Sequence, residues 1–301
     1  MPHYLNPKTD VTFKRIFAEH PHLLVHFLNS VMPFEAGRYI VDLEYLPAEL
    51  TPESPGKKLS IVDVRCKDNF GRHFIIEMQN DWNPDFFSRI IFNAGKVYVK
   101  QLDRGEDYHL LQPVYTLSIL NQNFDRKSDK FYHHYQIVNI ENTDEIIPGL
   151  EFILVELTEK FHPETIKDRK LMVLWLRFLK EVNEDMTELP AEMQENEFIR
   201  EAAQLCEKGA YTPEELARYE GFWDMVRIEK TRIGGAERKG RAEGRAEGRV
   251  EGEAKGRAEE KNEIALNLLK MGLSIEMVNE ATGLSTPQIE NLKIIQPCQN
   301  I

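Results

Sequence analysis

The sequence predicts an α/β protein whose core is followed by a helical C-terminal extension. Residues 60–79 alternate polar and apolar side chains on both sides of a short turn, which is typical of a β-hairpin. Residues 85–102 repeat apolar side chains at the spacing of an amphipathic helix. From residue 168 onward the pattern is helical. These three observations place strands and helices together in the first half of the chain and helices alone in the second.

The other elements follow from periodicity, caps and breakers along the chain. Before the hairpin we expect helices over residues 11–20 and around 23–31, a strand over 40–46 and a proline-rich loop over 47–58. After the amphipathic helix, strands are expected over residues 113–120, 131–140 and 151–157. The helical region is expected to contain helices over residues 169–182, 191–207 and 213 to about 230.

Length and composition restrict the class of protein. A chain of 301 residues with 42% apolar residues can form one large domain with an appendage, or two domains. Its net charge of −12 argues against a surface coated with basic residues for nucleic acid, although it permits a local basic groove. Three distant cysteines, Cys66, Cys206 and Cys298, argue against a disulfide framework or a structural zinc site. With no signal peptide and no apolar run that could span a bilayer, the sequence predicts a cytoplasmic location.

A low-complexity stretch marks a change in organisation near residue 236. Glycine recurs every fourth residue from Gly240 to Gly256 within a Gly-Arg-Ala-Glu repeat. One interpretation is a solvated linker or marginal helix, because each helical Gly costs about 1 kcal/mol relative to Ala. The other is a helix that becomes stable by self-association, which predicts a homo-oligomer. The expected organisation is a core over residues 1–160, a helical subdomain over 161–235, this repeat over 236–261 and a terminal segment over 262–295.

The terminal segment has the spacing of three short helices in a helix-turn-helix unit. Ser274 and Ser285 are placed to cap the second and third helices, and Gly272 and Gly283 lie where helices end. The third helix, TPQIENLK, carries one Lys and no Arg. Helices that read DNA usually carry more positive charge. We therefore expect this segment to mediate protein interaction or dimerisation rather than to read a DNA sequence.

The hairpin carries two acidic residues, Asp63 and Glu77, on one face, and Gln79 returns to the same face. If the turn pairs Lys67 with His73, Asp63 lies directly across from Glu77. Opposed acids whose Cβ atoms are about 5 Å apart repel each other, and a bound divalent cation would remove that cost. Carboxylate oxygens are ligands that Mg²⁺ prefers. The pattern indicates a two-carboxylate Mg²⁺ site, and the alternative is an exposed sheet face with ordinary polar residues.

Further polar residues are candidates for the same site. Asp10 is either a third acid or an acid stabilised by the dipole at the start of a helix. Lys14 lies one turn later and is a surface cation unless it contacts phosphate. The helix after the hairpin has a polar face that is either phosphate-binding or simply solvated, made of Arg89, Asn93, Lys96 and Lys100. The signature motifs of proteases, esterases and nucleotide-binding enzymes do not occur in the sequence.

Several segments together carry a family resemblance: NPKTDVTFKRIF, SIVDVRCKDNFG, HFIIEMQ, FFSRIIFNAGKVYVKQLDRGEDY and LQPVYTLSIL. Through them the chain resembles the Rpn family of recombination-promoting nucleases, transposase-like members of the PD-(D/E)XK nuclease superfamily. The resemblance implies a restriction-endonuclease-like core with a mixed sheet flanked by helices. In that core a first helix precedes a three-stranded meander, a helix crosses over and a further strand joins the sheet.

The resemblance also implies a function. It implies a DNA endonuclease that uses Mg²⁺ or another divalent cation, with Asp63 and Glu77 as metal ligands and Asp10 as an additional acid. Gln79 stands where most of the superfamily has a catalytic Lys, and a neutral amide can only donate and accept hydrogen bonds. Either the metal supplies more of the electrostatic stabilisation or another cation substitutes for that Lys. The candidates for this role and for contact with DNA phosphates are Lys14, Arg89 and Lys96.

Two hypotheses of different classes follow. The first is a metal-dependent DNA endonuclease that hydrolyses phosphodiester bonds and acts in recombination or transposition. A mobile-element, toxin or phage-defence setting is suggested by the family alone. The second is a DNA- or protein-binding module that keeps the nuclease fold with little or no activity. The acids Asp63 and Glu77 favour the first, whereas the missing Lys and the negative net charge favour the second.

Overall fold

The computed structural model describes residues 3–51, 56, 58–80, 84–125, 127–166 and 169–294. Cys298 lies outside the described residues, whereas Cys66 and Cys206 are buried free thiols. The chain divides into two compact units, Met1–Trp223 and Asp224–Ile301. The described strands all lie in the first unit.

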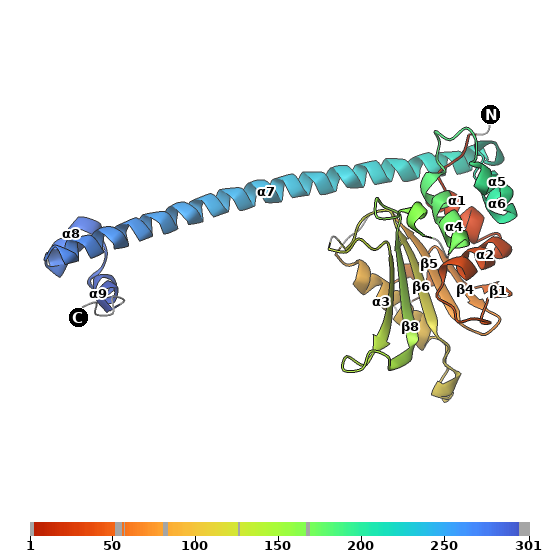
Figure 1. Ribbon diagram of the computed structural model, residues 1–301, viewed down its shortest axis with the longest axis horizontal. Coiled ribbons are helices and arrows are strands. Elements are labelled where there is room, and N and C mark those ends of the chain that lie inside the picture. The colour runs from red at the N-terminus through yellow and green to blue at the C-terminus, as the bar shows by residue number, and fades with distance from the viewer. Residues whose placement is uncertain are drawn as a thin grey trace. The chain divides into compact units, whose positions relative to one another are not determined.

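A six-stranded mixed sheet forms the centre of the first unit, in the order β1-β4-β5-β6-β8-β7 (Figure 1). Its strands are β1 (Leu43–Tyr45), β4 (Val64–Asp68), β5 (His73–Gln79), β6 (Val114–Leu120), β7 (Tyr132–Val138) and β8 (Ile146–Glu156). The first three form an antiparallel meander, and β6 and β8 continue the sheet in parallel with β5. The edge strand β7 is antiparallel to β8. This arrangement confirms the predicted mixed sheet.

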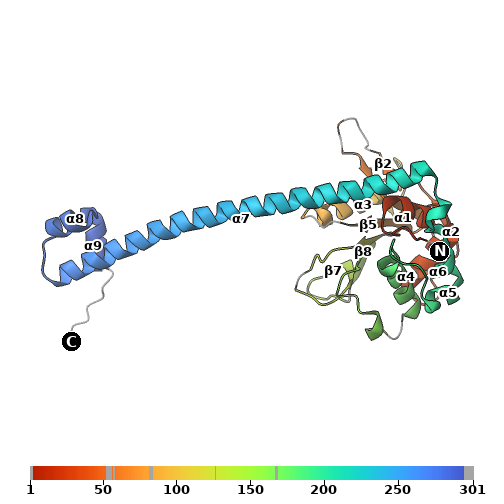
Figure 2. The ribbon, with the colours of Figure 1, turned by 90° about the horizontal axis from the view of Figure 1, so that it is seen from above.

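Helices cover both faces of the sheet, so the core has three layers (Figures 1 and 2). These helices are α1 (Asp10–Phe17), α2 (Pro21–Val31), α3 (Phe86–Val99), α4 (Lys170–Glu181), α5 (Ala191–Glu195) and α6 (Glu197–Leu205). Helix α3 connects the parallel strands β5 and β6 and covers one face through its apolar stripe. The other helices enclose the larger core on the opposite face, where the ring centroids of Phe17 and Trp175 lie 5.6 Å apart. Short 3-10 helices occur at Tyr108–Leu110, Pro163–Thr165 and Lys208–Ala210.

The hairpin has the predicted register but a shorter first strand. Lys67 pairs with His73, and Gly71 has the left-handed φ of +80° that the turn requires. The continuous strand expected from residue 60 is wrong, because the chain bends between β3 (Ser60–Ile61) and β4. Strand β3 instead pairs with β2 (Glu49–Leu50) in a separate two-stranded sheet. The bend turns Val62 toward α3, away from the face that the sequence predicted for it.

One predicted helix is split by a cap. Residues 191–207 form α5 and α6 because Asn196 adopts an extended conformation between them, with ψ of 120°. The Asn196 side chain accepts a hydrogen bond from the backbone amide of Ile199 at 3.1 Å. This bond satisfies one of the free amides at the start of α6. An Asn inside an apolar repeat was the available sequence signal for a new helix start.

The Gly-Arg-Ala-Glu repeat is helical and belongs to α7 (Pro213–Lys270), which begins in the first unit and ends in the second. Exposed ion pairs four residues apart accompany the repeat, for example between Arg249 and Glu253 at 3.9 Å. Such pairs favour a helix and oppose the effect of its glycines. Along the described residues, no helix combines the length and the apolar character needed to cross a membrane.

The end of the second unit is a small helical cluster (Figure 2). The last turns of α7 pack there with α8 (Ile275–Thr282) and α9 (Thr286–Ile294) around Ala265, Val278, Leu284 and Ile289. Ser274 caps α8 by accepting a hydrogen bond from the amide of Met277, and Gly283 ends α8 with a φ of +68°. The predicted caps therefore lie where the helices begin and end.

Candidate active site

The two hairpin acids lie at the start of β4 and near the end of β5. Glu77 is only 8% exposed and projects toward α3. Asp63 is half-buried and directly precedes β4. The ladder between these strands ends at the pair Val64 and Ile76, one position short of the predicted pair Asp63 and Glu77. The reason is that an Asp63 carboxylate oxygen, Oδ2, accepts a hydrogen bond from the backbone amide of Met78 at 2.7 Å.

Burial makes both acids costly to ionise. It raises the pKa of Glu77, and the charge of nearby Asp63 raises it further. It also raises the pKa of Asp63, although the Met78 amide acts in the opposite direction. The charge of Asp10 adds to the rise for Asp63. A positive ion between the two carboxylates would offset both burial and repulsion.

The two oxygens of Glu77 differ in their surroundings. Oε1 accepts a hydrogen bond from Nδ2 of Asn93 at 3.1 Å. Oε2 is buried and, among the described residues, accepts no hydrogen bond; Nη2 of Arg89 lies 3.7 Å from it. A buried carboxylate oxygen without a protein donor is usually satisfied by a water or an ion. Glu77 Oε2 therefore fits a cation better than it fits a closed protein core.

The donor set suits a hard divalent cation. Asp63 and Glu77 offer carboxylate oxygens, and Mg²⁺ is commonly held by one or two carboxylates, with waters and substrate phosphate completing its shell. Within the part of the chain that the structure describes, no group of three or more His, Cys, Asp or Glu side chains converges on one point. That composition is unlike a structural zinc centre, which takes four protein ligands.

Arg89 supplies positive charge beside Gln79. Its Nη2 donates a hydrogen bond to Oε1 of Gln79, and this same Nη2 lies 3.7 Å from Oε2 of Glu77. The Arg89 side chain is 37% exposed, although its Nε atom is buried. A cavity of about 510 Å³ opens next to it, lined by Lys58, Ser60, Asp85, Ser88, Arg89 and Phe92. The neutral Gln79 is thus accompanied by a cation from the neighbouring helix.

The start of α1 faces the carboxylates. Thr9 caps this helix by accepting from the Thr12 amide, so Asp10 occupies its first turn. Asp10 and Lys14 form an ion pair at 2.6 Å, and both side chains remain partly exposed. The Lys14 charge lowers the pKa of Asp63 whereas the Asp10 charge raises it. Both residues therefore act on Asp63 from the same side.

The rest of the polar stripe on α3 contacts protein. Lys96 donates hydrogen bonds to the backbone carbonyls of Leu50 and Lys58, at 3.1 and 2.6 Å. Lys100 likewise contacts the carbonyl of Thr51. Asn93 is only 1% exposed, so at this position the face is neither solvated nor open to a phosphate. The cause is the β2–β3 sheet, which packs against the stripe and which the sequence pattern did not reveal.

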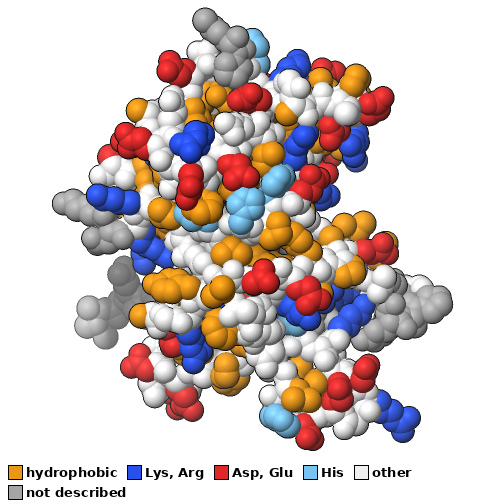
Figure 3. Space-filling view, turned by 90° about the vertical axis from the view of Figure 1, so that its right-hand side faces the viewer, with side chains coloured by type: hydrophobic (Ala, Val, Ile, Leu, Met, Phe, Trp, Pro, Cys, Tyr) orange, Lys and Arg blue, Asp and Glu red, His pale blue; other side chains and the backbone are white. Residues whose placement is uncertain are grey.

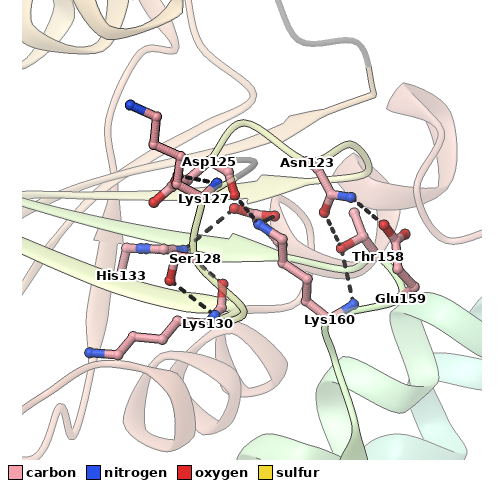
Figure 4. Close-up of polar contacts among 10 residues, drawn as sticks. Asn123, Asp125, Lys127, Ser128, Lys130, His133, Thr158, Glu159 and Lys160 are labelled. Carbon is pink, nitrogen blue, oxygen red and sulfur yellow. Dashed lines mark hydrogen bonds and ion pairs between the residues drawn. The ribbon is translucent and has the colours of Figure 1, made fainter.

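A second buried carboxylate, Glu156, lies at the end of β8 on the same face of the sheet as Glu77. Directly paired residues share a face, and the registers run from Gln79 to Leu120 and from Leu120 to Glu156. Glu156 is 0% exposed and forms ion pairs with Nζ of Lys160 at 2.9 Å and with Nε2 of His133 at 3.4 Å. Figure 4 shows Lys160 and His133 pointing toward one another from the two sides of this cluster. The cluster around Glu156 was not predicted. Its signal in the sequence was an acid in an apolar strand with a Lys four residues later.

A model of the PD-(D/E)XK nuclease family transposases matches residues 7–228. The chain belongs to this family. The match covers most of the chain and confirms both the predicted resemblance and the predicted fold class. It includes every site residue discussed above, whereas α8 and α9 lie beyond it. The chain matches no curated protein and no solved structure.

For this PD-(D/E)XK protein it stays a prediction that Glu77-Met78-Gln79 stands where the family name has an acid, any residue and a Lys. The structure brings Asp63, Glu77, Gln79 and Arg89 together, with the pair of Asp10 and Lys14 at one side. Lys96 lies farther along α3 and contacts the β2–β3 segment. The contact of Asn93 with Glu77 was also not predicted from the sequence.

Proposed function

We propose that the protein is a metal-dependent DNA endonuclease that hydrolyses phosphodiester bonds. Asp63 and Glu77 hold Mg²⁺ or another divalent cation. The observation that carries the proposal is Glu77 Oε2, a buried carboxylate oxygen that accepts no hydrogen bond from the described residues and lies next to a second acid. Family membership supports the reaction class. A role in recombination or transposition rests on the family alone.

When bound, the cation supplies an activated water and stabilises charge on the scissile phosphate. The chain's own residues provide the rest. Gln79 orients a water or a phosphate oxygen through its amide. Arg89 provides the positive charge that Lys supplies elsewhere in the superfamily, and its planar guanidinium suits a phosphate. Asp10 supports Asp63 from α1, and Lys14 balances the added negative charge.

DNA is the proposed partner, held locally rather than by a basic surface. On the face drawn in Figure 3, positive side chains are scattered among negative ones. We assign phosphate contact to Arg89 and Lys14, which are both partly exposed beside the carboxylates. Lys96 was a third candidate, but its ammonium binds two backbone carbonyls, so we assign it to the β2–β3 segment. The cavity next to Arg89 offers room for the nucleic acid backbone.

The alternative is a nuclease-fold binding module with little or no catalysis. Gln79 favours it, because a neutral amide cannot replace the charge of a Lys. Self-association through the C-terminal region, including the helical repeat of α7, remains our prediction for either case. It would bring two sites to one DNA duplex. A cytoplasmic location is likewise kept as a prediction.

Plasmid nicking by the purified full chain, with and without Mg²⁺, tests the proposal. The native protein should nick supercoiled DNA only with a divalent cation, and Asp63→Ala should remove the activity. Asp107→Ala is a matched control, because the Asp107 side chain is 81% exposed and distant in sequence from the site. Equal nicking by native protein and Asp63→Ala would contradict the site. No nicking with any divalent cation, together with retained DNA binding, would support the binding module.

A further inference from the structure

A chain of hydrogen bonds runs from β3 through α3 to Glu77. The Ser60 hydroxyl, Oγ, donates to Oδ1 of Asn93 at 2.6 Å. Nδ2 of Asn93 donates to Oε1 of Glu77 at 3.1 Å. Asn93 is 1% exposed and lies on the buried side of α3, whose other buried residues are Phe86, Ile90, Ala94 and Val97. A polar side chain at this position requires an explanation.

Which groups donate and which accept in these hydrogen bonds follows from the chemistry of the side chains. An ionised Glu77 carboxylate can only accept hydrogen bonds, so the amide nitrogen of Asn93 must face it. The amide oxygen then faces Ser60, whose hydroxyl can donate. The opposite orientation would place two oxygens against each other. Glu77 therefore selects the orientation in which Asn93 donates to it, and the Ser60 hydroxyl holds the amide in that orientation by donating to Oδ1.

As a result, the two oxygens of Glu77 have different roles. Oε1 is occupied by Asn93, whereas Oε2 accepts no hydrogen bond from the described residues. We infer that Asn93 is a positioning residue that holds the Glu77 carboxylate so that Oε2 is presented to the divalent cation, with Ser60 fixing the amide of Asn93. The inference rests on the proposed function of Asp63 and Glu77 as cation ligands. Mutation of groups that orient metal ligands in this way typically weakens metal affinity by about 10- to 100-fold.

The same segment also positions Asp63, which lies three residues after Ser60. Lys96 holds this segment against α3 through the carbonyls of Leu50 and Lys58. The β2–β3 sheet, α3 and both carboxylates are thus connected by direct contacts. A purely structural role for Asn93, in which it only satisfies the buried Glu77 carboxylate, would lower stability in an apolar variant without a specific loss of cation affinity.

The test is calorimetric titration of Mn²⁺ into the metal-free full chain without DNA. Asn93→Leu removes the donor at similar volume and should weaken Mn²⁺ binding by roughly 10- to 100-fold. Ser60→Ala should weaken it by about fivefold, the effect expected for one hydrogen bond, and Ser60→Thr, which keeps the hydroxyl, should restore native affinity. DNA affinity measured in EDTA should be unchanged in all three variants, because the hydrogen-bond chain acts on the cation ligand.

Thr116→Val is the matched control. Thr116 is buried in β6, and its hydroxyl donates to the carbonyl of Glu151 at 3.4 Å. The substitution therefore removes a hydrogen bond from the core that does not involve Glu77. This variant should bind Mn²⁺ like the native chain. If Asn93→Leu does not fold, the Mn²⁺ affinities of Ser60→Ala and Ser60→Thr test the inference. These variants should fold, because Ser60 is only half-buried.

Native Mn²⁺ affinity in a folded Asn93→Leu protein, or in Ser60→Ala, would overturn the inference while leaving the proposed function intact. A native chain that binds no Mn²⁺ and nicks no DNA would overturn both. The two failures are distinguishable, because only the second affects the native protein itself.

Discussion

Glu77 and Glu156 are two buried glutamates in similar places with different surroundings. Both lie near the carboxyl ends of parallel strands, on the same face of one sheet. They are 8% and 0% exposed. Ligands of α/β proteins commonly bind at this edge of a sheet. Position and burial alone would therefore nominate both residues for a functional site.

Their partners separate them. Glu156 is balanced from within the chain by Lys160, four residues later, and His133 of β7 lies 3.4 Å from it. Figure 4 shows Lys160 and His133 at this edge. At the same edge of the sheet, hydrogen bonds connect Asn123 with Thr158 and with Glu159. Glu77 has a neutral donor on one oxygen and a more distant cation near the other, and that cation is shared with Gln79. Among the described residues neither oxygen of Glu156 accepts a hydrogen bond either, so the difference lies in the charge balance: an ammonium lies 2.9 Å from Glu156, whereas the guanidinium near Glu77 is 3.7 Å away and shared with Gln79. We therefore interpret Glu156 as structural and expect Glu77 to bind a cation.

The largest expected effect is the loss of activity in Glu77→Gln. Removing the negative charge deprives the site of one of two cation ligands, and plasmid nicking with Mg²⁺ should fall on the order of a thousandfold or more. Stability should not fall, since an amide avoids the cost of burying a charge and can still accept from Asn93. Urea unfolding checks the second point. Native nicking by Glu77→Gln would remove the distinction between the two glutamates.

The second effect is the reverse pattern in Glu156→Gln. This change leaves the Lys160 ammonium buried without its carboxylate, and breaking a buried pair costs about 3–5 kcal/mol of unfolding free energy. Nicking per folded molecule should stay native. Glu151→Gln is the control on the same strand: its ion pair with His134 is more exposed, so the loss should be under about 1 kcal/mol. Full stability of Glu156→Gln would show that the pair is not structural.

The third effect tests which group supplies the missing positive charge. Arg89→Ala should lower nicking by roughly a hundredfold, the loss typical of one group that stabilises developing charge. Gln79→Lys in the Arg89→Ala background should recover much of this loss, because it restores a cation at the family position. Arg104→Ala, at an exposed arginine in the loop after α3, is the control and should nick normally. If the double variant stays as inactive as Arg89→Ala, Arg89 does not stand in for the Lys.

The sequence predicted the hairpin and its register because these depend on local chemistry. A left-handed Gly71 and alternating side chains determine which residues pair, and alternation alone places Glu77 and Gln79 on one face. The bend before Asp63 escaped prediction because its cause is a bond to the amide of Met78 in another strand. Contacts between distant segments leave no periodic signal.

The two regions that distinguish the glutamates escaped prediction for the same reason. The pattern of α3 correctly indicates an apolar stripe, but it cannot show that a second small sheet covers the polar stripe and buries Asn93. Glu156 has one partner at helical spacing in sequence, Lys160, whereas His133 arrives from a neighbouring strand. Candidate site residues were therefore predictable by type and face, and their partners were not.

The smallest expected effect is a pH-dependent change in the stability of the metal-free protein, caused by Glu77 and Asp63. Burial raises the pKa of Glu77 and Asp63 in the folded protein. Below about pH 4 both acids are protonated in the folded and unfolded states, so no penalty arises. As the pH rises through the raised folded-state pKa values, the unfolded chain releases these protons more readily, and the metal-free protein should lose stability.

Mn²⁺ should reverse this loss, because it binds the ionised carboxylates. At ten times its pH 8 dissociation constant, Mn²⁺ should stabilise the native protein at pH 8 by about 1.4 kcal/mol, and the same concentration should raise Tm less at pH 5. Thermal unfolding followed by circular dichroism measures both. Glu77→Gln should diminish the pH effect and the Mn²⁺ effect together, whereas Glu156→Gln should retain both despite its lower stability. If Mn²⁺ stabilised all three proteins equally, the cation would bind somewhere other than the open oxygen of Glu77.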